Sequence, residues 1–395
     1  MSHKYADIII DISHEAIDRT FQYKIPETLA AEIGIGTKVS IPLGRGNHLR
    51  TGYVISFSDK PKFDEEKLKD IDSICENGVA IEGELIELAA YMKEQYGSTM
   101  INALKTVMPI KEKVRGLVHK EVCLLPDRQI CEERCAQYQK KNAKAKLRLL
   151  QELMQERVIP YELVTGKLNI SSPTLKAMEK EGTIAIEEEG YYRTIFEGDG
   201  KKAENRCEGM TEENSQREMP NEQQQAVIDR ILTDYASGKR DTYLLKGVTG
   251  SGKTLVYLNV IEKVVAMGKQ AIVLIPEIAL TYQTVKRFRQ RFGNKVTIMN
   301  SKLSKGERFD QFERAKNGDV SVMIGPRSAL FTPFSNLGVI VIDEEQEGSY
   351  KSENTPRYHA VDVSKYRCVQ HNALLLLGSA TPSVETMYRA RQGVY

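Results

Sequence analysis

The first 57 residues consist largely of short segments rich in isoleucine, valine, tyrosine and threonine, separated by glycine-rich turns at 34–36 and 44–46. Such segments predict β-strands, because β-branched and aromatic side chains suit a pleated sheet. The four predicted strands are 5–12, 19–26, 37–43 and 49–57. A helical period follows over 80–104, with one apolar face: Leu85, Leu88, Ala89 and Met92. We expect residues 1–110 to form a β-rich, barrel-like module.

The segment 143–196 predicts two helices and a small hairpin. The first helix is amphipathic and reads AKLRLLQELMQE. The second has a serine cap, a proline in its first turn and a glycine at its end: Ser171 or Ser172, Pro173 and Gly182. Two strands are then expected to flank a turn at Glu189 and Gly190. This order predicts a winged helix over 111–196, although residues 110–142 have no clear pattern of their own.

Residues 197–218 contain almost no apolar side chains and many charges, which predicts a linker. Apolar runs then alternate with helical stretches to the end of the chain: TYLLKG, AIVLIPE, VTIM, SVMIG, GVIVIDEE and LLLLGSATP. Continuous rather than alternating apolar strands indicate a parallel sheet covered on both faces. The fold class expected is therefore multidomain α/β.

Composition narrows the class of protein. The chain has 395 residues, of which 41% are hydrophobic and 28% charged, with a net charge of +2. These values exclude a histone-like polycation and an acidic tail protein. Between positions 111 and 180 there are 15 lysines and arginines against 9 acidic residues, an excess that a solvated helical face also explains. No apolar run reaches the ~18 residues of a membrane helix.

The six cysteines form no CxxC pair, which leaves no readable zinc ribbon or disulfide framework. Cys131 and Cys135 are four residues apart and would share a helix face, but the sequence offers no second pair of metal ligands beside them. The expectation is a reducing compartment.

The segment 247–254 reads GVTGSGKT and fits the phosphate-binding pattern GxxxxGKT. It follows a predicted strand and precedes a helix, where backbone N–H groups and the helix N-terminus meet a phosphate. Lys253 is expected to reach the terminal phosphates and Thr254 to offer its hydroxyl to Mg²⁺. The predicted phosphate-binding residues are Gly247, Val248, Thr249, Gly250, Ser251, Gly252, Lys253 and Thr254.

Two further elements end the next apolar strands. Asp343 is expected to hold Mg²⁺, and Glu344 to orient and deprotonate an attacking water. A kinase needs no such water-activating carboxylate, so the pair favours hydrolysis. The segment 378–382, GSATP, combines small residues with a hydroxyl and suits a sensor of the γ-phosphate. Together the three elements predict a nucleic-acid-dependent motor.

This order of motifs resembles superfamily 2 helicases, and in detail the bacterial helicases that restart replication. The resemblance runs through the whole chain. It implies that Gln223 contacts the adenine edge and that Gln346 bridges the γ-phosphate and the segment 378–382. It also implies an N-terminal pocket that captures the 3′ end of a nascent strand, lined by Phe21, Gln22 and Gly44, although plain barrel core also explains Phe21.

The segment 276–283 matches a further motif of the family. The resemblance also implies a DNA track lined by 301–308 and 324–331, which includes Arg327. A loop with Tyr350 and Lys351 is expected to couple DNA to hydrolysis by stacking on or pairing with a single strand. A half-buried surface tyrosine explains Tyr350 equally well without the resemblance.

Several positions depart from the family. Gln346 replaces a histidine, from which we expect altered coupling, and Gln22 replaces an aspartate. Asn300 stands in place of another histidine, and Val361 in place of an arginine whose role the sequence does not assign.

The expected architecture follows the family. It begins with a 3′-end DNA-binding domain at 1–110 and a winged helix at 111–196 that touches duplex or fork DNA. A linker at 197–218 then leads to a first RecA-like lobe at 219–395. Members of the family continue with a second lobe that carries zinc-binding cysteines and an arginine that completes the ATP site. We therefore expect zinc only in that absent part. This N-terminal portion is expected to bind ATP–Mg²⁺ and forked DNA but to hydrolyse ATP slowly.

The resemblance implies a 3′→5′ DNA helicase that recognises forked DNA and starts replication restart through primosome assembly. Expected partners are DNA with a free 3′ end, primosome and helicase-loading proteins, and single-stranded-DNA-binding protein. The expected setting is a monomer in the bacterial cytoplasm, associated with the nucleoid and not with a membrane. Two alternatives stay open: an ATP-switched fork-binding platform without productive unwinding, and another superfamily 2 DNA translocase.

Overall fold

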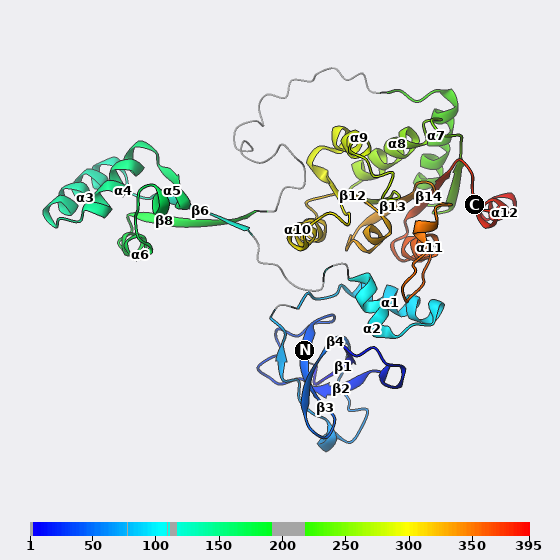
Figure 1. Cartoon of the computed structure of the whole chain (residues 1–395), viewed down its shortest axis with the longest axis horizontal. Helices are drawn as coiled ribbons and strands as arrows, with labels where there is room; N and C mark the ends of the chain where they lie inside the picture. Colours follow the sequence, from blue (N-terminus) through cyan, green and yellow to red (C-terminus); the bar gives the residue numbers. More distant parts are fainter. Residues whose placement is uncertain (1–2, 77, 109, 111–116, 192–217) are drawn as a thin grey trace. The chain divides into compact units, whose positions relative to one another are not determined.

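A computed structural model of the chain describes residues 3–76, 78–108, 110, 117–191 and 218–395. It divides into two compact units, one formed by 115–193 and the other by the rest of the chain (Figure 1). The predicted linker 197–218 lies outside the described residues except for its last position. Within the described part of the chain, every helix is too short or too polar to cross a membrane.

The N-terminal module is a five-stranded antiparallel sheet in the order β2-β1-β4-β3-β5. All four predicted strands are confirmed. The strands are β1 Tyr5–Ile10, β2 Phe21–Lys24, β3 Lys38–Leu43, β4 His48–Ser58 and the short β5 Ser73–Ile74. Two 3₁₀ turns, Glu15–Ile17 and Glu65–Lys67, lie between them.

The sheet of this module curls toward closure. An isolated bridge joins Lys24, at the end of β2, to Asp70, just before β5. The backbone N–H of Lys24 also donates to the carbonyl of Lys69 over 2.9 Å. Alternate residues of the strands fill the interior, among them Ile8, Val39 and Val54. The pattern is barrel-like, as the sequence predicts, because closing the sheet satisfies the backbone groups of its outer strands.

The helical stretch predicted over 80–104 forms two helices, α1 Gly83–Tyr96 and α2 Met100–Val107. Gly97 ends α1 with a positive φ of 58°, a conformation in which glycine has no steric cost. Thr99 then caps α2 through its side-chain oxygen, which accepts from the N–H of Asn102.

The second unit contains a three-stranded sheet in the order β7-β6-β8, together with four helices in its described residues. The helix α6 begins and ends as predicted, with Pro173 in its first turn and Gly182 after its end at a φ of 64°. The elements are β6 Leu117–Leu124, α3 Arg128–Lys140, α4 Lys144–Gln155, β7 Val158–Pro160, α5 Tyr161–Gly166, α6 Ser172–Lys180 and β8 Ile184–Tyr191.

One prediction for this unit is wrong. Glu189 and Gly190 form no hairpin turn but lie within β8, where they pair with His119 and Val118 of β6. The strand partner of β8 therefore comes from the start of the unit, in the stretch to which the sequence assigned no element. Cys131 and Cys135 belong to an apolar cluster, and the Cys135 thiol lies 3.9 Å from the sulfur of Met154.

Residues 218–395 form a lobe built on a six-stranded sheet in the order β11-β12-β10-β13-β14-β9. Every neighbouring pair is parallel, and each of the six predicted apolar runs is a strand. The strands are β9 Thr242–Lys246, β10 Gln270–Leu274, β11 Val296–Ile298, β12 Val322–Gly325, β13 Leu337–Ile342 and β14 Leu374–Ser379.

Helices cover both faces of this sheet. In β13, Val339 and Val341 join one apolar layer, whereas Ile340 and Ile342 join the other. The helices are α7 Glu222–Ala236, α8 Lys253–Ala266, α9 Tyr282–Phe292, α10 Lys305–Lys316, α11 Ala360–His371 and α12 Val384–Arg391. Two 3₁₀ turns, η5 Arg327–Phe331 and η6 Gly348–Tyr350, follow β12 and β13.

Helices α1 and α2 share an apolar core with one face of the lobe, which explains why the N-terminal module and the lobe belong to one compact unit. The rings of Tyr91 and Tyr366 stack with centroids 4.0 Å apart. Lys316 forms an ion pair with Glu82 over 2.7 Å.

Candidate nucleotide site and nucleic-acid-binding residues

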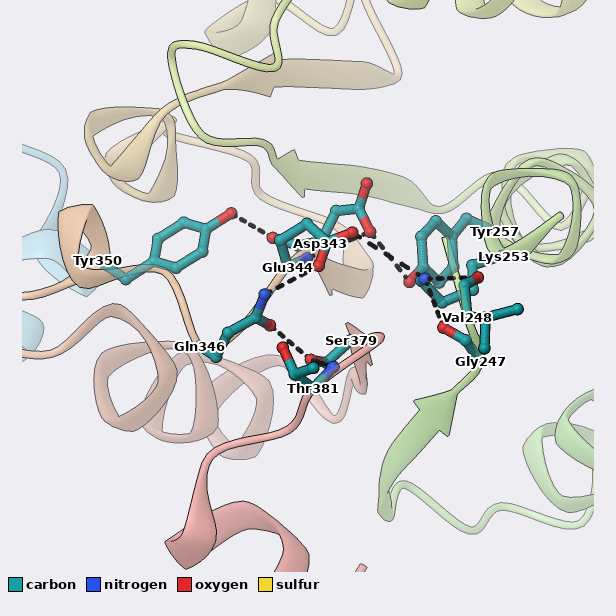
Figure 2. A network of polar contacts seen from close by, with 10 residues as sticks. All are labelled: Gly247, Val248, Lys253, Tyr257, Asp343, Glu344, Gln346, Tyr350, Ser379 and Thr381. Carbon is teal, nitrogen blue, oxygen red and sulfur yellow. Dashed lines mark hydrogen bonds and ion pairs between the residues drawn. The ribbon is translucent and has the colours of Figure 1, made fainter. Parts of the chain in front are cut away.

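The motifs of the lobe meet at one edge of its sheet. β9, β14 and β13 are adjacent, with Lys246 in register with Ser379 and Leu377 in register with Ile342. Because the carboxyl ends of parallel strands lie at the same edge, the segments that follow them converge there. The segments 247–254, 343–346 and 379–381 therefore form one polar site, drawn in Figure 2.

The segment 247–252 curls between β9 and α8. Gly250 and Gly252 take positive φ values of 80° and 82°, and Gly252 is the N-cap of α8. Lys253, 9% exposed, donates from Nζ to the carbonyl oxygen of Gly247 over 2.8 Å and lies 4.0 Å from Oε1 of Glu344. The loop residues from Val248 to Ser251 are exposed, which leaves their backbone accessible to a ligand.

Asp343 is held in place by two donors. Its Oδ1 accepts from the backbone N–H of Glu344 over 3.2 Å and from the hydroxyl of Tyr257 over 3.3 Å. Burial raises the pKa of Asp343, and the Glu344 charge adds to that rise, whereas the Tyr257 hydrogen bond and Lys253 oppose it. Burial and the Asp343 charge raise the pKa of the Tyr257 phenol, so the phenol stays protonated and acts as the donor.

Glu344 follows with a φ of 49°, in the left-handed region that side chains other than glycine rarely adopt. Such a backbone persists only where the surrounding contacts fix it, and it commonly accompanies functional sites. Here the left-handed backbone of Glu344 turns the chain sharply between Asp343 and Glu345, whose side chains have different neighbours.

Gln346 joins the acidic segment to the segment that follows β14. Its amide nitrogen donates to Oε2 of Glu344 over 2.9 Å, and its amide oxygen accepts from the hydroxyl of Ser379 (Figure 2). The Ser379 oxygen in turn accepts from the N–H of Thr381 over 3.0 Å. A glutamine thus makes the contact between the two segments directly, with one donor and one acceptor.

Besides Tyr257, the structure reveals two further site residues that the sequence analysis missed. Glu345 is 2% exposed, and its carboxylate accepts from the N–H of Ser383 over 2.7 Å and from the hydroxyl of Thr386 over 3.1 Å. It therefore fixes the start of α12. Gln224 donates to the carbonyl oxygen of Ser251 over 2.8 Å. The position before it, Gln223, is exposed, and its contact with adenine remains a prediction.

Asn221 and Gln224 carry the signal that could have revealed the second of these contacts. They form a capping box at the start of α7, a pattern readable from the sequence as Asn followed by Gln three residues later. For Glu345 the corresponding signal is weaker: a serine and a threonine three residues apart, just after the segment 378–382.

The prediction that Tyr350 stacks on DNA is wrong for this conformation. Tyr350 is 1% exposed, and its hydroxyl donates to the carbonyl oxygens of Asp343, over 2.7 Å, and Leu274, over 3.1 Å. A base needs an open ring face, which this packing does not leave. The tyrosine instead ties the loop after β13 to the ends of β13 and β10.

Arg327 holds the same loop from outside. Its guanidinium donates to the carbonyl oxygens of Ser349 and Lys351 and lies over the ring of Tyr358, 5.4 Å from the ring centroid. Beside it is a cavity of about 620 Å³. Part of its lining is polar or charged: Glu277, Asn300, Ser301, Arg308, Arg327 and Lys351. Lys351 is exposed, and contact of Arg327 and Lys351 with DNA remains a prediction.

The three predicted DNA-binding residues of the N-terminal module each contact a different part of that module, unlike the residues of the nucleotide site, which contact one another. Gln22 is 6% exposed, with its amide bonded to the backbone of the loop after β4, at Lys60 and Lys62. Phe21, at the start of β2, is half-buried under the guanidinium of Arg19. Gly44 has a φ of 70°, and its carbonyl oxygen accepts from Nζ of Lys69 over 2.5 Å. A shared 3′-end pocket remains a prediction.

The site fits a nucleotide with Mg²⁺. Carboxylate and hydroxyl oxygens are the protein ligands that Mg²⁺ prefers, and Asp343 and Thr254 supply one of each at the sheet edge. The ammonium of Lys253 donates to a backbone carbonyl oxygen. A phosphate oxygen also accepts hydrogen bonds from an ammonium, so a bound phosphate can take the place of this carbonyl as the acceptor. Among the residues that the structure describes, no group of three or more histidine, cysteine, aspartate and glutamate side chains is placed to hold a metal ion.

Two regions of the chain match models of known protein domains. Residues 7–109 match the model of the PriA 3′ DNA-binding domain, and residues 221–390 match that of the DEAD/DEAH box helicase. Replication restart protein PriA of Bacillus subtilis is 33% identical over 454 aligned positions, which cover 99% of this chain and 55% of that protein.

Two further relatives carry the same name. PriA of Chlamydia muridarum is 32% identical over 402 positions, covering 99% of this chain and 50% of the relative. PriA of Haemophilus influenzae is 32% identical over 388 positions, covering 96% and 50%. This chain spans about half the length of these relatives. Along nearly all of its length this chain is similar to the replication restart proteins PriA, with a region that matches a 3′ DNA-binding domain followed by one that matches a DEAD/DEAH box helicase.

Proposed function

We propose that this chain is part of an ATP-dependent DNA helicase that acts in replication restart. In this proposal the chain binds ATP–Mg²⁺ and a DNA fork with a free 3′ end. The proposed direction of movement is 3′→5′. The observation that carries the proposal is the direct contact of three motifs at one sheet edge, in a chain whose N-terminal module matches a 3′ DNA-binding domain.

The proposed chemistry is hydrolysis of ATP. The backbone N–H groups of 247–252 and the start of α8 bind the phosphates, and Lys253 binds the terminal ones. Glu344 accepts a proton from the water that attacks the γ-phosphorus, while the bond to the leaving ADP oxygen breaks. Thr254 and Asp343 would hold Mg²⁺, which when bound offsets phosphate charge.

The proposed coupling runs through contacts already described. Gln346 joins Glu344 to Ser379, and Tyr350 joins the backbone of Asp343 to the loop that Arg327 holds. A DNA phosphate that draws the Arg327 guanidinium away from this loop would release the Tyr350 contact. The state of the nucleotide site would then depend on whether DNA is bound. Primosome and helicase-loading proteins belong to the proposal as partners of the whole protein.

The test is a linkage measurement. The affinity of the chain for a fluorescent ATP analogue is measured in the presence of Mg²⁺, with and without a saturating fork that has a 3′-hydroxyl end. The affinity of the chain for the fork is then measured with and without the analogue. Coupled sites change each other's affinity by the same factor, which we expect to be about fivefold or more. Independent binding of the two ligands, or no nucleotide binding, would contradict the proposal. A matched fork with a 3′-phosphate end tests whether the free 3′ end contributes.

A further inference from the structure

Tyr257 lies beside the nucleotide site but outside the three motifs. It is four residues after Lys253 on α8, a spacing that places both side chains on one face of the helix. Its side chain is 1% exposed, and its hydroxyl is 3.3 Å from Oδ1 of Asp343 (Figure 2). One helix face thus presents an ammonium and a phenol to the acidic segment.

Gly378 makes room for this phenol. A Cβ atom built at position 378 would lie 1.4 Å from the hydroxyl oxygen of Tyr257 and 2.6 Å from its Cζ atom. The same atom would be 3.4 Å from Oδ1 of Asp343. Gly378 lies within the regular strand β14, so the reason for glycine here is space and not backbone conformation. The bare backbone of β14 allows Tyr257 to reach Asp343.

The contact determines how the carboxylate of Asp343 is presented. Oδ1 accepts from both Tyr257 and the N–H of Glu344, which leaves Oδ2 as the oxygen for a ligand. A hydrogen bond to an ionised carboxylate is stronger than one between neutral groups. The ring of Tyr257 is buried and closely packed against the backbone of Gly378, and it therefore restricts the rotation of this carboxylate.

We infer that Tyr257 is a positioning residue for Mg²⁺ binding: its hydroxyl fixes the Asp343 carboxylate in the orientation that the metal requires, and Gly378 supplies the space for it. The inference rests on the proposed ATP–Mg²⁺ function of the site and adds a residue to it. The alternative is that Tyr257 only fills the core between α8 and the sheet.

The test separates metal binding from nucleotide binding. The affinity of a fluorescent ATP analogue is measured across a Mg²⁺ titration and also in EDTA, for the unaltered chain and for Tyr257→Phe. Phenylalanine keeps the ring and removes only the hydroxyl. We expect Tyr257→Phe to need about tenfold more Mg²⁺ for half-maximal tightening. Affinity in EDTA and the urea midpoint of unfolding should change little.

Tyr243→Phe is the matched control. Tyr243 also donates to a carboxylate of the same lobe, that of Asp234, over 2.6 Å. Its removal costs a similar hydrogen bond away from the site and should leave the Mg²⁺ midpoint unchanged. Gly378→Ala is the second probe: it drives the tyrosine away from Asp343 and should raise the Mg²⁺ midpoint at least as far as Tyr257→Phe. In an Asp343→Asn background, Tyr257→Phe should add nothing.

The outcomes are distinct. Failure of the unaltered chain to bind the analogue with Mg²⁺ would overturn the proposed function itself. A Mg²⁺ midpoint of Tyr257→Phe within twofold of the unaltered chain would overturn only the role of Tyr257. Equal weakening in EDTA and in Mg²⁺, or a further loss in the Asp343→Asn background, would assign Tyr257 to core packing instead.

Discussion

The parallel sheet of the lobe and the antiparallel sheet of the N-terminal module organise their polar residues differently. In the lobe, β9, β13 and β14 all end at one edge, and residues from three distant segments hydrogen-bond to one another there. In the N-terminal module, β2 and β3 are separated by two other strands. Phe21 at the start of β2 and Gly44 after β3 are related only through closure of the sheet.

This difference shows what topology contributes to a site. Parallel strands bring their carboxyl ends together whatever lies between them in the sequence, so the nucleotide edge follows from the fold class. An antiparallel sheet alternates its ends, and a site there depends on particular loops. In this chain Lys69 makes that connection: its backbone carbonyl binds Lys24 of β2 and its ammonium binds the carbonyl of Gly44.

The largest expected effect tests whether the two regions act separately. Lys253→Ala removes the cation that lies within the phosphate loop and 4.0 Å from Glu344. We expect loss of at least 100-fold in affinity for an ATP analogue with Mg²⁺, because the phosphate charge then lacks its main partner. Fork affinity in the absence of nucleotide, measured by fluorescence anisotropy, should be unchanged. A parallel loss of fork binding would mean that the regions are not separate.

An intermediate effect is expected in the N-terminal module. Phe21→Ala removes a half-buried ring, and stacking of a base on an aromatic side chain contributes roughly 1–3 kcal/mol. We therefore expect about tenfold weaker binding of a fork with a 3′-hydroxyl end. Phe63→Ala is the control, since Phe63 is a 65% exposed phenylalanine of the same module. Equal losses for forks with hydroxyl and phosphate ends would place Phe21 outside any 3′-end pocket.

The smallest expected effect comes from a buried histidine at the place where the lobe meets α1. His371 of α11 lies 3.2 Å from Glu84 of α1, and burial, with Arg367 and Lys269 nearby, lowers its pKa to about 4. A lowered pKa means that the folded chain binds fewer protons than the unfolded chain from about pH 6.5 down to pH 4. Stability should therefore fall as the pH falls through this window.

After allowance for solvent screening, we expect a loss of about 1 kcal/mol between pH 7 and pH 5. Urea unfolding followed by tyrosine fluorescence measures it. His371→Gln should flatten this dependence, whereas His48→Gln, at an exposed position of β4, should not. An unchanged slope in His371→Gln would show that burial of His371 does not determine the pH dependence.

Continuous apolar runs predicted every strand of the lobe, since a strand buried on both faces leaves little room for polar residues. Asp343, Glu344 and Lys253 were recognisable because each directly follows such a strand or the glycine loop after it. The sequence did not reveal Tyr257, Gln224 or Glu345. Their roles depend on which residues lie opposite them in space, and no local pattern carries that information.

The errors have similar causes. Glu189 and Gly190 have turn-like composition, but β6 supplies a partner strand that extends through them. That strand was not recognised because His119, Lys120 and Glu121 interrupt its apolar pattern. Tyr350 follows an acidic segment in a polar stretch, which suggests exposure. Two backbone carbonyls at the strand ends instead receive its hydroxyl.

Glu345 gives α12 a mechanical role. Its carboxylate attaches the first turn of the helix to the residue next to Gln346, so the start of α12 is fixed to the edge of the sheet at which the motifs meet. With 8 residues, α12 is about 12 Å long. A rotation of roughly 10° about the Glu345 attachment would move the far end by about 2 Å. The start of α12 thus lies next to the segment 378–382, and a small rotation there becomes a larger displacement at the other end of the helix.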